Sequence, residues 1–331
     1  MPKVELHVHL DGCLRPQTML ELAREQGVRL PADDPEGLRR ALYVRHAKSL
    51  EEYLERYTIT LSVMQTPQAL ERIAYEFVLD SAAEQVRYVE VRYCPALHTP
   101  ALTLTQAVEA PLTGLKRGES ETGTMARLIV CGLRTLPAKV SLDLARLATD
   151  YVGDGVVGFD LAGSERGHPA KDHAAAFEHA RSHGLACTCH AGEGDGPDSI
   201  RQAVEHCGAQ RIGHGTRLWE DPALEETVRQ RQIPLEVCVT SNVHTGAVRD
   251  AAEHPLKRYL RLGCRLTLNT DSRLMDGITL SDEYWLAHRT LGLDRAELDR
   301  LVLNAARSAF LPEPEKQRLV ERLTQELKET N

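Results

Sequence analysis

The segment "VELHVHLDG", Val4 to Gly12, places two histidines one residue apart in an apolar run. Alternate side chains of a strand share a face, so His7 and His9 point the same way and their apolar neighbours point the other way. Imidazoles in an apolar setting need polar partners, and a metal ion can satisfy two of them at once. On this pair alone, a metal site and ordinary hydrogen bonding are equal alternatives.

Three further apolar runs lead into residues of the same chemical type. "CTCHAGE" contains His190 with Glu193 three residues later, "IGHG" contains His214, and "LTLNTDS" contains Asp271. Imidazole and carboxylate groups are common ligands of zinc. Each residue alone could be a loop histidine, a surface glutamate or a capping aspartate, but such a set at the ends of apolar runs is improbable by chance. The sequence therefore predicts a metal site with acid–base groups beside it.

Eight short apolar runs, separated by helical patterns, supply the elements that must position these residues. The runs begin at Lys3, Val86, Met125, Gly155, Leu185, Arg211, Ile233 and Cys264. Strands that alternate with helices in this way predict a closed (β/α)8 TIM barrel, with a doubly wound open sheet as the alternative. We expect one domain over residues 1–331, with a helical insertion at about 49–85 after the first strand. In such a barrel the carboxyl ends of the strands form the active site, so the candidate residues should converge there.

Composition narrows the classes of partner. The 331 residues carry a formal net charge of −8, which disfavours binding to nucleic acid. No stretch reaches the roughly 20 apolar residues needed to cross a membrane, and no leader-like segment opens the chain. We therefore expect a cytoplasmic protein that acts on a small molecule. Most of the eight cysteines lie in or beside apolar runs, which favours buried, reduced thiols.

Six motifs, in order along nearly the whole chain, resemble those of the adenosine deaminase family of the amidohydrolase superfamily. They are "VELHVHLDG", "DLAG", "HAGE", "IGHG", "TSN" and "LNTD", and "NAARSAF" near the C-terminus is also similar to a family segment. The resemblance implies a (β/α)8 barrel with one catalytic zinc per chain. It also implies hydrolysis of the 6-amino group of a purine nucleoside, with adenosine or 2′-deoxyadenosine converted to inosine or 2′-deoxyinosine and ammonia.

The resemblance assigns roles to individual residues. Four of them match the zinc ligands of the family: His7, His9, His190 and Asp271. Glu193 matches the proton-transfer glutamate, and His214 matches the histidine that, with Asp271, handles the attacking hydroxide. The implied substrate contacts are His9, Asp11 at the sugar, and Gly163 at the purine.

One position departs from the family pattern. "NTDSRL" places Ser272 where the family usually has a second aspartate, which meets purine N7. A serine hydroxyl can donate a hydrogen bond while neutral, but its reach is shorter. Ser272 is therefore still expected to contact the substrate, and 6-aminodeoxyfutalosine or a modified adenosine becomes an alternative substrate.

The sequence leaves several alternatives open. A binuclear amidohydrolase is disfavoured because "VVGFDLAGSE" lacks the lysine that usually bridges two metals, and a non-catalytic metal-binding relative is a weaker alternative. The apolar stripe Tyr53, Leu54, Tyr57 and Leu61 could form a lid or ordinary core packing, so the 5′ substituent of the substrate is not fixed. The sequence does not predict the oligomeric state.

Overall fold

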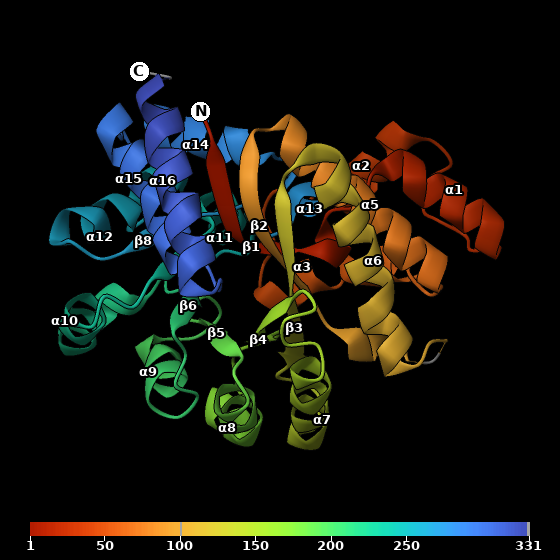
Figure 1. Ribbon diagram of the computed structural model, residues 1–331, viewed down its shortest axis with the longest axis horizontal. Coiled ribbons are helices and arrows are strands. Elements are labelled where there is room, and N and C mark those ends of the chain that lie inside the picture. Colours follow the sequence, from red (N-terminus) through yellow and green to blue (C-terminus); the bar gives the residue numbers. More distant parts are fainter. Residues whose placement is uncertain (100, 330–331) are drawn as a thin grey trace.

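The computed structural model describes residues 1–99 and 101–329 and contains a ring of eight parallel strands (Figure 1). Each strand pairs with the next one in the chain, and the predicted (β/α)8 barrel is confirmed. Two backbone hydrogen bonds link the ends of the ring, from His9 N–H to Asp271 O at 2.7 Å and from Asp271 N–H to His7 O at 3.1 Å. The strands are β1 Lys3–His9, β2 Val86–Tyr93, β3 Met125–Leu133, β4 Val156–Ala162, β5 Ala186–Ala191, β6 Arg211–His214, β7 Leu235–Val237 and β8 Leu266–Leu268.

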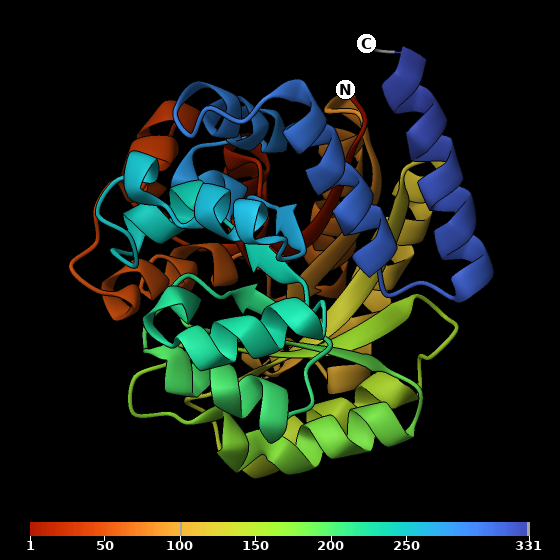
Figure 2. The same cartoon turned by 90° about the vertical axis from the view of Figure 1, so that its left-hand side faces the viewer.

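Helices follow the strands and surround the barrel (Figure 2). Between β1 and β2 lie α1 Pro16–Gln26, α2 Pro35–Leu42, α3 Leu50–Leu54, α4 Tyr57–Leu61 and α5 Pro67–Ala83. The next strands are followed by α6 Leu104–Thr122, α7 Ala138–Thr149, α8 Ala174–Ser182, α9 Pro197–Glu205, α10 Pro222–Gln230, α11 Val239–His244 and α12 Leu256–Leu262. The chain closes with α13 Arg273–Asp276, α14 Leu280–Arg289, α15 Arg295–Ser308 and α16 Glu313–Glu329.

Local sequence signals explain where the first helices begin and end. Pro16 occupies the first turn of α1, and Gly27 ends that helix with a left-handed φ of 66°. Ser49 caps α3 by accepting a hydrogen bond from Glu52 N–H at 3.3 Å. The short helices α3 and α4 follow this cap, and residues of both line the mouth of the barrel.

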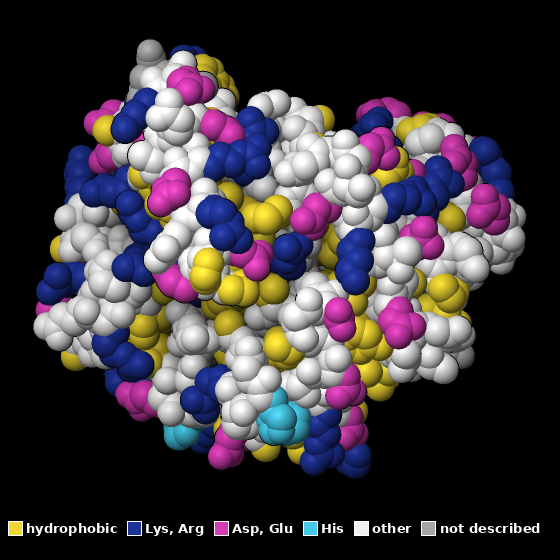
Figure 3. All heavy atoms as spheres, in the orientation of Figure 1, with side chains coloured by type: hydrophobic (Ala, Val, Ile, Leu, Met, Phe, Trp, Pro, Cys, Tyr) yellow, Lys and Arg dark blue, Asp and Glu magenta, His cyan; other side chains and the backbone are white. Residues whose placement is uncertain are grey.

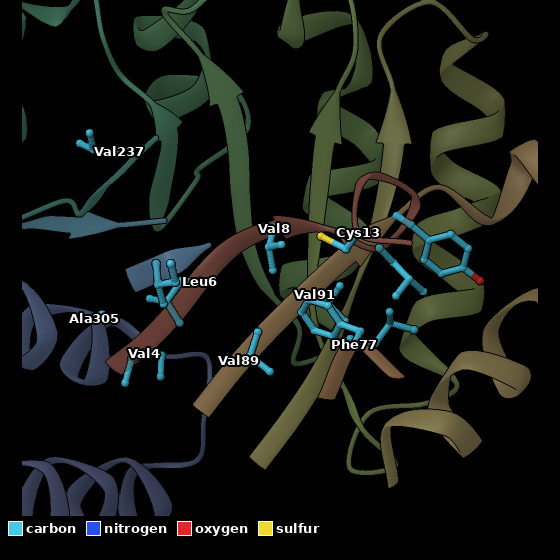
Figure 4. Close-up of a cluster of buried hydrophobic side chains, with 14 of the residues drawn as sticks. Val4, Leu6, Val8, Cys13, Phe77, Val89, Val91, Val237 and Ala305 are labelled. Carbon is cyan, nitrogen blue, oxygen red and sulfur yellow. The ribbon is translucent and has the colours of Figure 1, made fainter. Parts of the chain in front are cut away.

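The two faces of β1 show how the barrel separates packing from chemistry. Val4, Leu6 and Val8 are fully buried in the hydrophobic core, close to Val89 and Val91 of β2 (Figure 4). The alternate residues of the same strand are Glu5, His7 and His9. Because successive side chains of a strand point to opposite faces, the apolar set packs beneath the helices and the polar set faces the interior of the barrel.

The outer surface carries charges of both signs. In the face that Figure 3 presents, Lys and Arg side chains are interspersed with Asp and Glu side chains. Among the residues that the structure describes, no helix is long and apolar enough to cross a membrane.

Candidate active site

Four side chains from three strand ends meet at the mouth of the barrel. His7 and His9 come from β1, His190 from β5, and Asp271 follows β8. One potential ligand atom from each lies within 4.8 Å of the others. His9 Nε2 lies 3.1 Å from His190 Nε2 and 3.3 Å from Asp271 Oδ1. The structure thus brings together the four residues that the sequence singles out as ligands.

Hydrogen bonds behind two of the imidazoles set their tautomers. His7 Nδ1 donates to Glu236 Oε2 at 2.8 Å, and His190 Nδ1 lies 3.0 Å from Asp160 Oδ2. Both Nε2 atoms therefore direct a lone pair into the site. His7 Nε2 is buried and has no hydrogen-bond partner. An unpartnered nitrogen beside two further imidazoles and a carboxylate fits a divalent metal, because that donor set is typical of such sites.

Buried charges hold the two supporting carboxylates ionised. Burial alone would raise the pKa of Glu236, but Arg92 and Arg211 keep it well below its ordinary value. Burial acts in the same way on Asp160, and His190 and Arg92 again keep its pKa well below the ordinary value. Both carboxylates therefore accept hydrogen bonds from the imidazole Nδ1–H groups, which fixes the tautomer that leaves each Nε2 available to a metal.

Two of the candidate residues adopt a backbone conformation that is uncommon outside glycine. His214 has a φ of 61° and Asp271 a φ of 64°, both in the left-handed region. Such a conformation costs of the order of 1–3 kcal/mol for a residue with a Cβ, and it clusters at functional sites. His214 is the last residue of β6, Asp271 follows β8 after Asn269 and Thr270, and both side chains line the cavity at the barrel mouth.

A cavity of about 420 Å³ opens above this cluster. This volume is in the range of small-molecule sites. Seven of the residues predicted for the site line it: His9, Asp11, Gly163, His190, Glu193, His214 and Asp271. Tyr53, Leu54, Tyr57 and Leu61 of the inserted helices also line it, so this stripe faces the cavity while it also packs against the hydrophobic core.

Glu193 is buried beside the cluster, and its environment favours a protonated carboxyl. Burial, followed by the nearby charges of Asp271 and Glu165, raises its pKa well above the ordinary value. Its Oε2 lies 3.4 Å from His214 Nε2. Glu193 can therefore carry a proton at neutral pH and deliver it to a bound molecule.

The turn that carries Glu193 is organised by one carboxylate. Glu165 Oε1 accepts a hydrogen bond from Gly192 N–H at 2.6 Å. Its Oε2 accepts from the N–H groups of Glu193, Gly194 and Asp195, at distances of 3.0, 2.7 and 3.0 Å. The backbone of the "AGEGD" turn thus wraps around one anion, which fixes the direction of the Glu193 side chain.

Ser272 does not line the cavity. It is fully buried, and its hydroxyl is hydrogen-bonded to the hydroxyl of Tyr57, which does line the cavity. A Cβ built on Gly12 would lie 2.7 Å from Ser272 Oγ, so the chain has little space around this serine. The structure therefore places Tyr57 at the surface that a bound molecule would meet.

Several supporting residues lie within the sequence motifs, but the sequence alone predicts no individual role for them. Ser241 donates to Asp271 Oδ2 at 2.7 Å, and Asn242 Nδ2 lies 3.0 Å from His214 Nδ1. Both belong to the "TSN" motif. Asp160 and Glu165 belong to "DLAGSE", and the only hint at Glu236 is a charged residue within an apolar run.

Known proteins with the same architecture identify the family. The chain matches the profile of the family described as "Adenosine deaminase" over residues 2–326. An adenosine deaminase of Mycobacterium avium is 41% identical over 97% of this chain and 93% of its own length. The crystal structure of an adenine deaminase from Arthrobacter aurescens superposes with a TM-score of 0.92 at 28% identity, covering 99% of both chains.

Two further structures carry informative ligands. An amidohydrolase from Burkholderia ambifaria with bound zinc has a TM-score of 0.90 at 25% identity, over 99% of this chain and 91% of its own. An Arabidopsis ADAL protein in complex with IMP has a TM-score of 0.88 at 29% identity, over 99% of this chain and 97% of its own. The match to the family profile covers nearly every residue, and this chain belongs to the adenosine deaminase family.

Proposed function

We propose that this protein is a zinc-dependent aminohydrolase that converts adenosine and 2′-deoxyadenosine to inosine and 2′-deoxyinosine with release of ammonia. The proposal rests on Glu193, a buried carboxyl whose raised pKa favours the protonated form, beside a three-histidine, one-aspartate cluster. Its relatives at about 41% identity are adenosine deaminases, which supports the same substrate.

The residues of the cavity divide the chemistry among them. His7, His9, His190 and Asp271 would hold the zinc, which would act as a Lewis acid and lower the pKa of a water molecule at the site to about 7. Glu193 would donate a proton to purine N1, so that the ring accepts attack at C6 without a full negative charge. His214 would orient the attacking oxygen. Asp11 would bind the sugar, and Gly163 would contact the purine.

The charge of the cavity favours a nucleoside over a nucleotide. Apart from Asp271 and Glu193, the described residues that line it include three acidic side chains, Asp11, Glu51 and Glu55. None of the described lining residues is Lys or Arg. A 5′-phosphate inside this cavity would lie close to Glu51 and Glu55 and would meet no basic side chain in its lining, which is unfavourable in a partly buried site. Three basic side chains, Lys48, Arg166 and Arg217, line a separate adjoining pocket. We therefore expect the protein to reject adenosine 5′-monophosphate even though its structural relatives include proteins crystallised with IMP and GMP.

Parallel assays of ammonia release by the zinc-loaded protein test this assignment. The substrates are adenosine, 2′-deoxyadenosine, adenine, adenosine 5′-monophosphate and 6-aminodeoxyfutalosine. We expect the first two to turn over with a kcat/KM at least 100-fold above that of the monophosphate. Preferential turnover of adenosine 5′-monophosphate would contradict the argument from charge.

Ser272 supports a second candidate substrate, 6-aminodeoxyfutalosine. Because it replaces the usual aspartate and is covered by Tyr57, the contact to the purine ring differs from the family pattern. Turnover of 6-aminodeoxyfutalosine alone would assign the protein to that modified nucleoside. A zinc-loaded protein that released ammonia from none of the substrates would instead support a non-catalytic, metal-binding relative.

A further inference from the structure

A chain of hydrogen bonds behind His214 fixes which of its ring nitrogens carries the proton. The hydrogen bonds run from the backbone N–H of Leu256 through the side chains of His254 and Asn242 to that of His214. All three of these side chains are buried. This hydrogen-bonded chain joins three separate parts of the barrel, because His214 ends β6, Asn242 lies on α11 and His254 precedes α12. The direction of every bond in the chain can be derived from its first donor.

The first two bonds define the state of His254. The backbone N–H of Leu256 can only donate, and it lies 3.1 Å from His254 Nδ1. Nδ1 therefore presents a lone pair, and the proton of this ring lies on Nε2. Burial also lowers the pKa of His254 to about 3, which agrees with a neutral ring.

The state of His254 determines the orientation of the Asn242 amide. His254 Nε2 lies 3.1 Å from Asn242 Oδ1, and Thr216 Oγ1 donates to the same oxygen at 3.0 Å. A protonated nitrogen must face an acceptor, so the oxygen of the amide points to His254 and its NH₂ group points to His214. Asn242 is fully buried, and these contacts leave it no alternative orientation with equal hydrogen bonding.

The amide in turn determines the tautomer of His214. Asn242 Nδ2 has protons but no lone pair, and it lies 3.0 Å from His214 Nδ1. His214 Nδ1 must therefore accept, so the proton of the ring lies on Nε2. That nitrogen is buried without a hydrogen-bond partner, 3.4 Å from Glu193 Oε2 and at the wall of the cavity.

We infer that Asn242 is a positioning residue that holds His214 as a hydrogen-bond donor, with Nε2–H directed into the site. His214 then offers a proton to the oxygen atom that it orients and has no lone pair available there to act as a base. Its role in catalysis rests on the proposed function, whereas its tautomer does not.

Nitrogen-15 NMR of the metal-free protein, labelled at histidine, tests the tautomer directly. We expect the Nδ1 signal of His214 at the position of an unprotonated ring nitrogen. His98 is the internal reference for the opposite tautomer, because its Nδ1 faces the carbonyl oxygen of Met64 at 2.8 Å and must carry the proton. Asn242→Asp should move the His214 proton to Nδ1, since a carboxylate there requires a donor. A protonated Nδ1 in the unaltered protein would overturn the inference.

Kinetics of two variants separate this role from a merely structural one. Asn242→Asp keeps the size of the side chain but inverts the hydrogen bond, and an inverted tautomer costs about 10⁴-fold in kcat in the serine protease triad. We expect a loss in kcat of about 10²–10⁴-fold with little change in KM. Asn242→Ala only releases the ring, and we expect a smaller loss, below about 10-fold.

A merely structural role predicts that the loss in kcat of each variant follows its loss of zinc and of thermal stability, because alanine leaves a cavity and aspartate buries a charge. An equal or larger loss in Asn242→Ala, with zinc content and thermal stability matched, would contradict the assignment. If the unaltered protein released no ammonia from any nucleoside, the proposed function would fail, and the nitrogen-15 spectrum would still decide the tautomer.

Discussion

At the scale of single residues, Glu193 unites two properties that a proton donor needs. Burial and neighbouring carboxylates raise its pKa and so favour the protonated carboxyl, and it lies beside the ligand cluster at the wall of the cavity. A carboxyl with an ordinary pKa would be ionised at neutral pH and could only accept. The environment of this residue, and not its identity alone, makes it suitable for general acid catalysis.

The variant Glu193→Gln tests this role. Glutamine keeps the size of the side chain but cannot deliver a proton, so kcat should fall by about 10²–10⁴-fold while zinc remains bound. Elemental analysis of the purified variant and its rate of ammonia release are the measurements. Exposed Glu178→Gln is the matched control and should behave like the unaltered protein. Near-normal turnover of Glu193→Gln would rule out this proton donor.

The variant His190→Ala removes a proposed ligand and should lose both zinc and activity.

Ser241 offers a separate test of how a ligand is held. Its hydroxyl donates to Asp271 Oδ2 at 2.7 Å and orients the carboxylate toward the histidines. Because partners behind a ligand tune its affinity, Ser241→Ala should weaken zinc binding by about 10–100-fold. Competition with a chelator measures this change. Thr124→Val removes a buried hydroxyl that bonds Val86 O at the other end of the barrel, and its zinc affinity should stay unchanged. An equal loss in both variants would indicate a general effect on folding.

At the scale of elements, apolar runs bounded by turn residues identify all eight strands because buried parallel strands leave that pattern. The pattern does not show where β7 ends. The run from Ile233 to Asn242 reads as one strand, but β7 ends at Val237 and the remainder forms α11. A short apolar run cannot distinguish a strand from a buried helix. The helix brings Ser241 to Asp271 and Asn242 to His214.

Contacts between distant segments set the limit of prediction from the sequence. Residue types at strand ends indicate which groups can meet, because all strands of a barrel end at the same face. The partner of His7 is Glu236, 229 positions away in the chain, and no local pattern pairs them. Ser272 was expected at the substrate because it occupies the position of a family aspartate. Its burial behind Tyr57 depends on where the inserted helix α4 settles.

The pair of Tyr57 and Ser272 leads to a prediction about this helix. Their hydroxyls are hydrogen-bonded, which ties α4 to the residue that follows Asp271. Tyr57→Phe removes this bond and should raise KM for adenosine about 3–10-fold, a change that corresponds to one hydrogen bond, with kcat nearly unchanged. Steady-state kinetics is the measurement. Tyr75→Phe, which removes a hydroxyl bonded to Glu121 on the surface, serves as the control.

A double variant makes the test specific to the pair. Ser272→Ala should raise KM as much as Tyr57→Phe does, and the combination should add little, because either change alone removes the same bond. Additive effects would show that the two hydroxyls act independently on the substrate.

At the scale of the whole molecule, buried ion pairs connect strands that lie far apart in the chain. Arg92 of β2 contacts two of them: its Nη2 lies 3.0 Å from Glu236 Oε2 on β7, and its Nη1 lies 2.9 Å from Asp160 Oδ2 on β4. Glu236 and Asp160 also support the ligating histidines. Removing one partner of a buried pair typically costs about 3–5 kcal/mol, so the metal site and the stability of the barrel depend on the same charges.

Glu283 differs from these paired carboxylates because it is buried without a cationic partner among the described contacts. It lies on α14, is fully buried, and accepts a hydrogen bond from Thr240 N–H at 2.9 Å. Burial raises its pKa to about 8. Glutamate in an unfolded chain has a pKa of about 4.3, so between these two values the folded protein binds one proton more than the unfolded chain does.

The sign of the resulting pH dependence follows from this difference. As pH rises from about 4.3 to about 8, the contribution of Glu283 to the free energy of unfolding should fall by up to about 1.4 kcal/mol per pH unit. Glutamine cannot ionise, so Glu283→Gln should gain stability relative to the unaltered protein as pH rises through this window. Urea unfolding at pH 5.5, 6.5 and 7.5, at one fixed zinc concentration, measures the difference. Glu178→Gln should show no such trend, and a difference independent of pH would mean that Glu283 is ionised throughout.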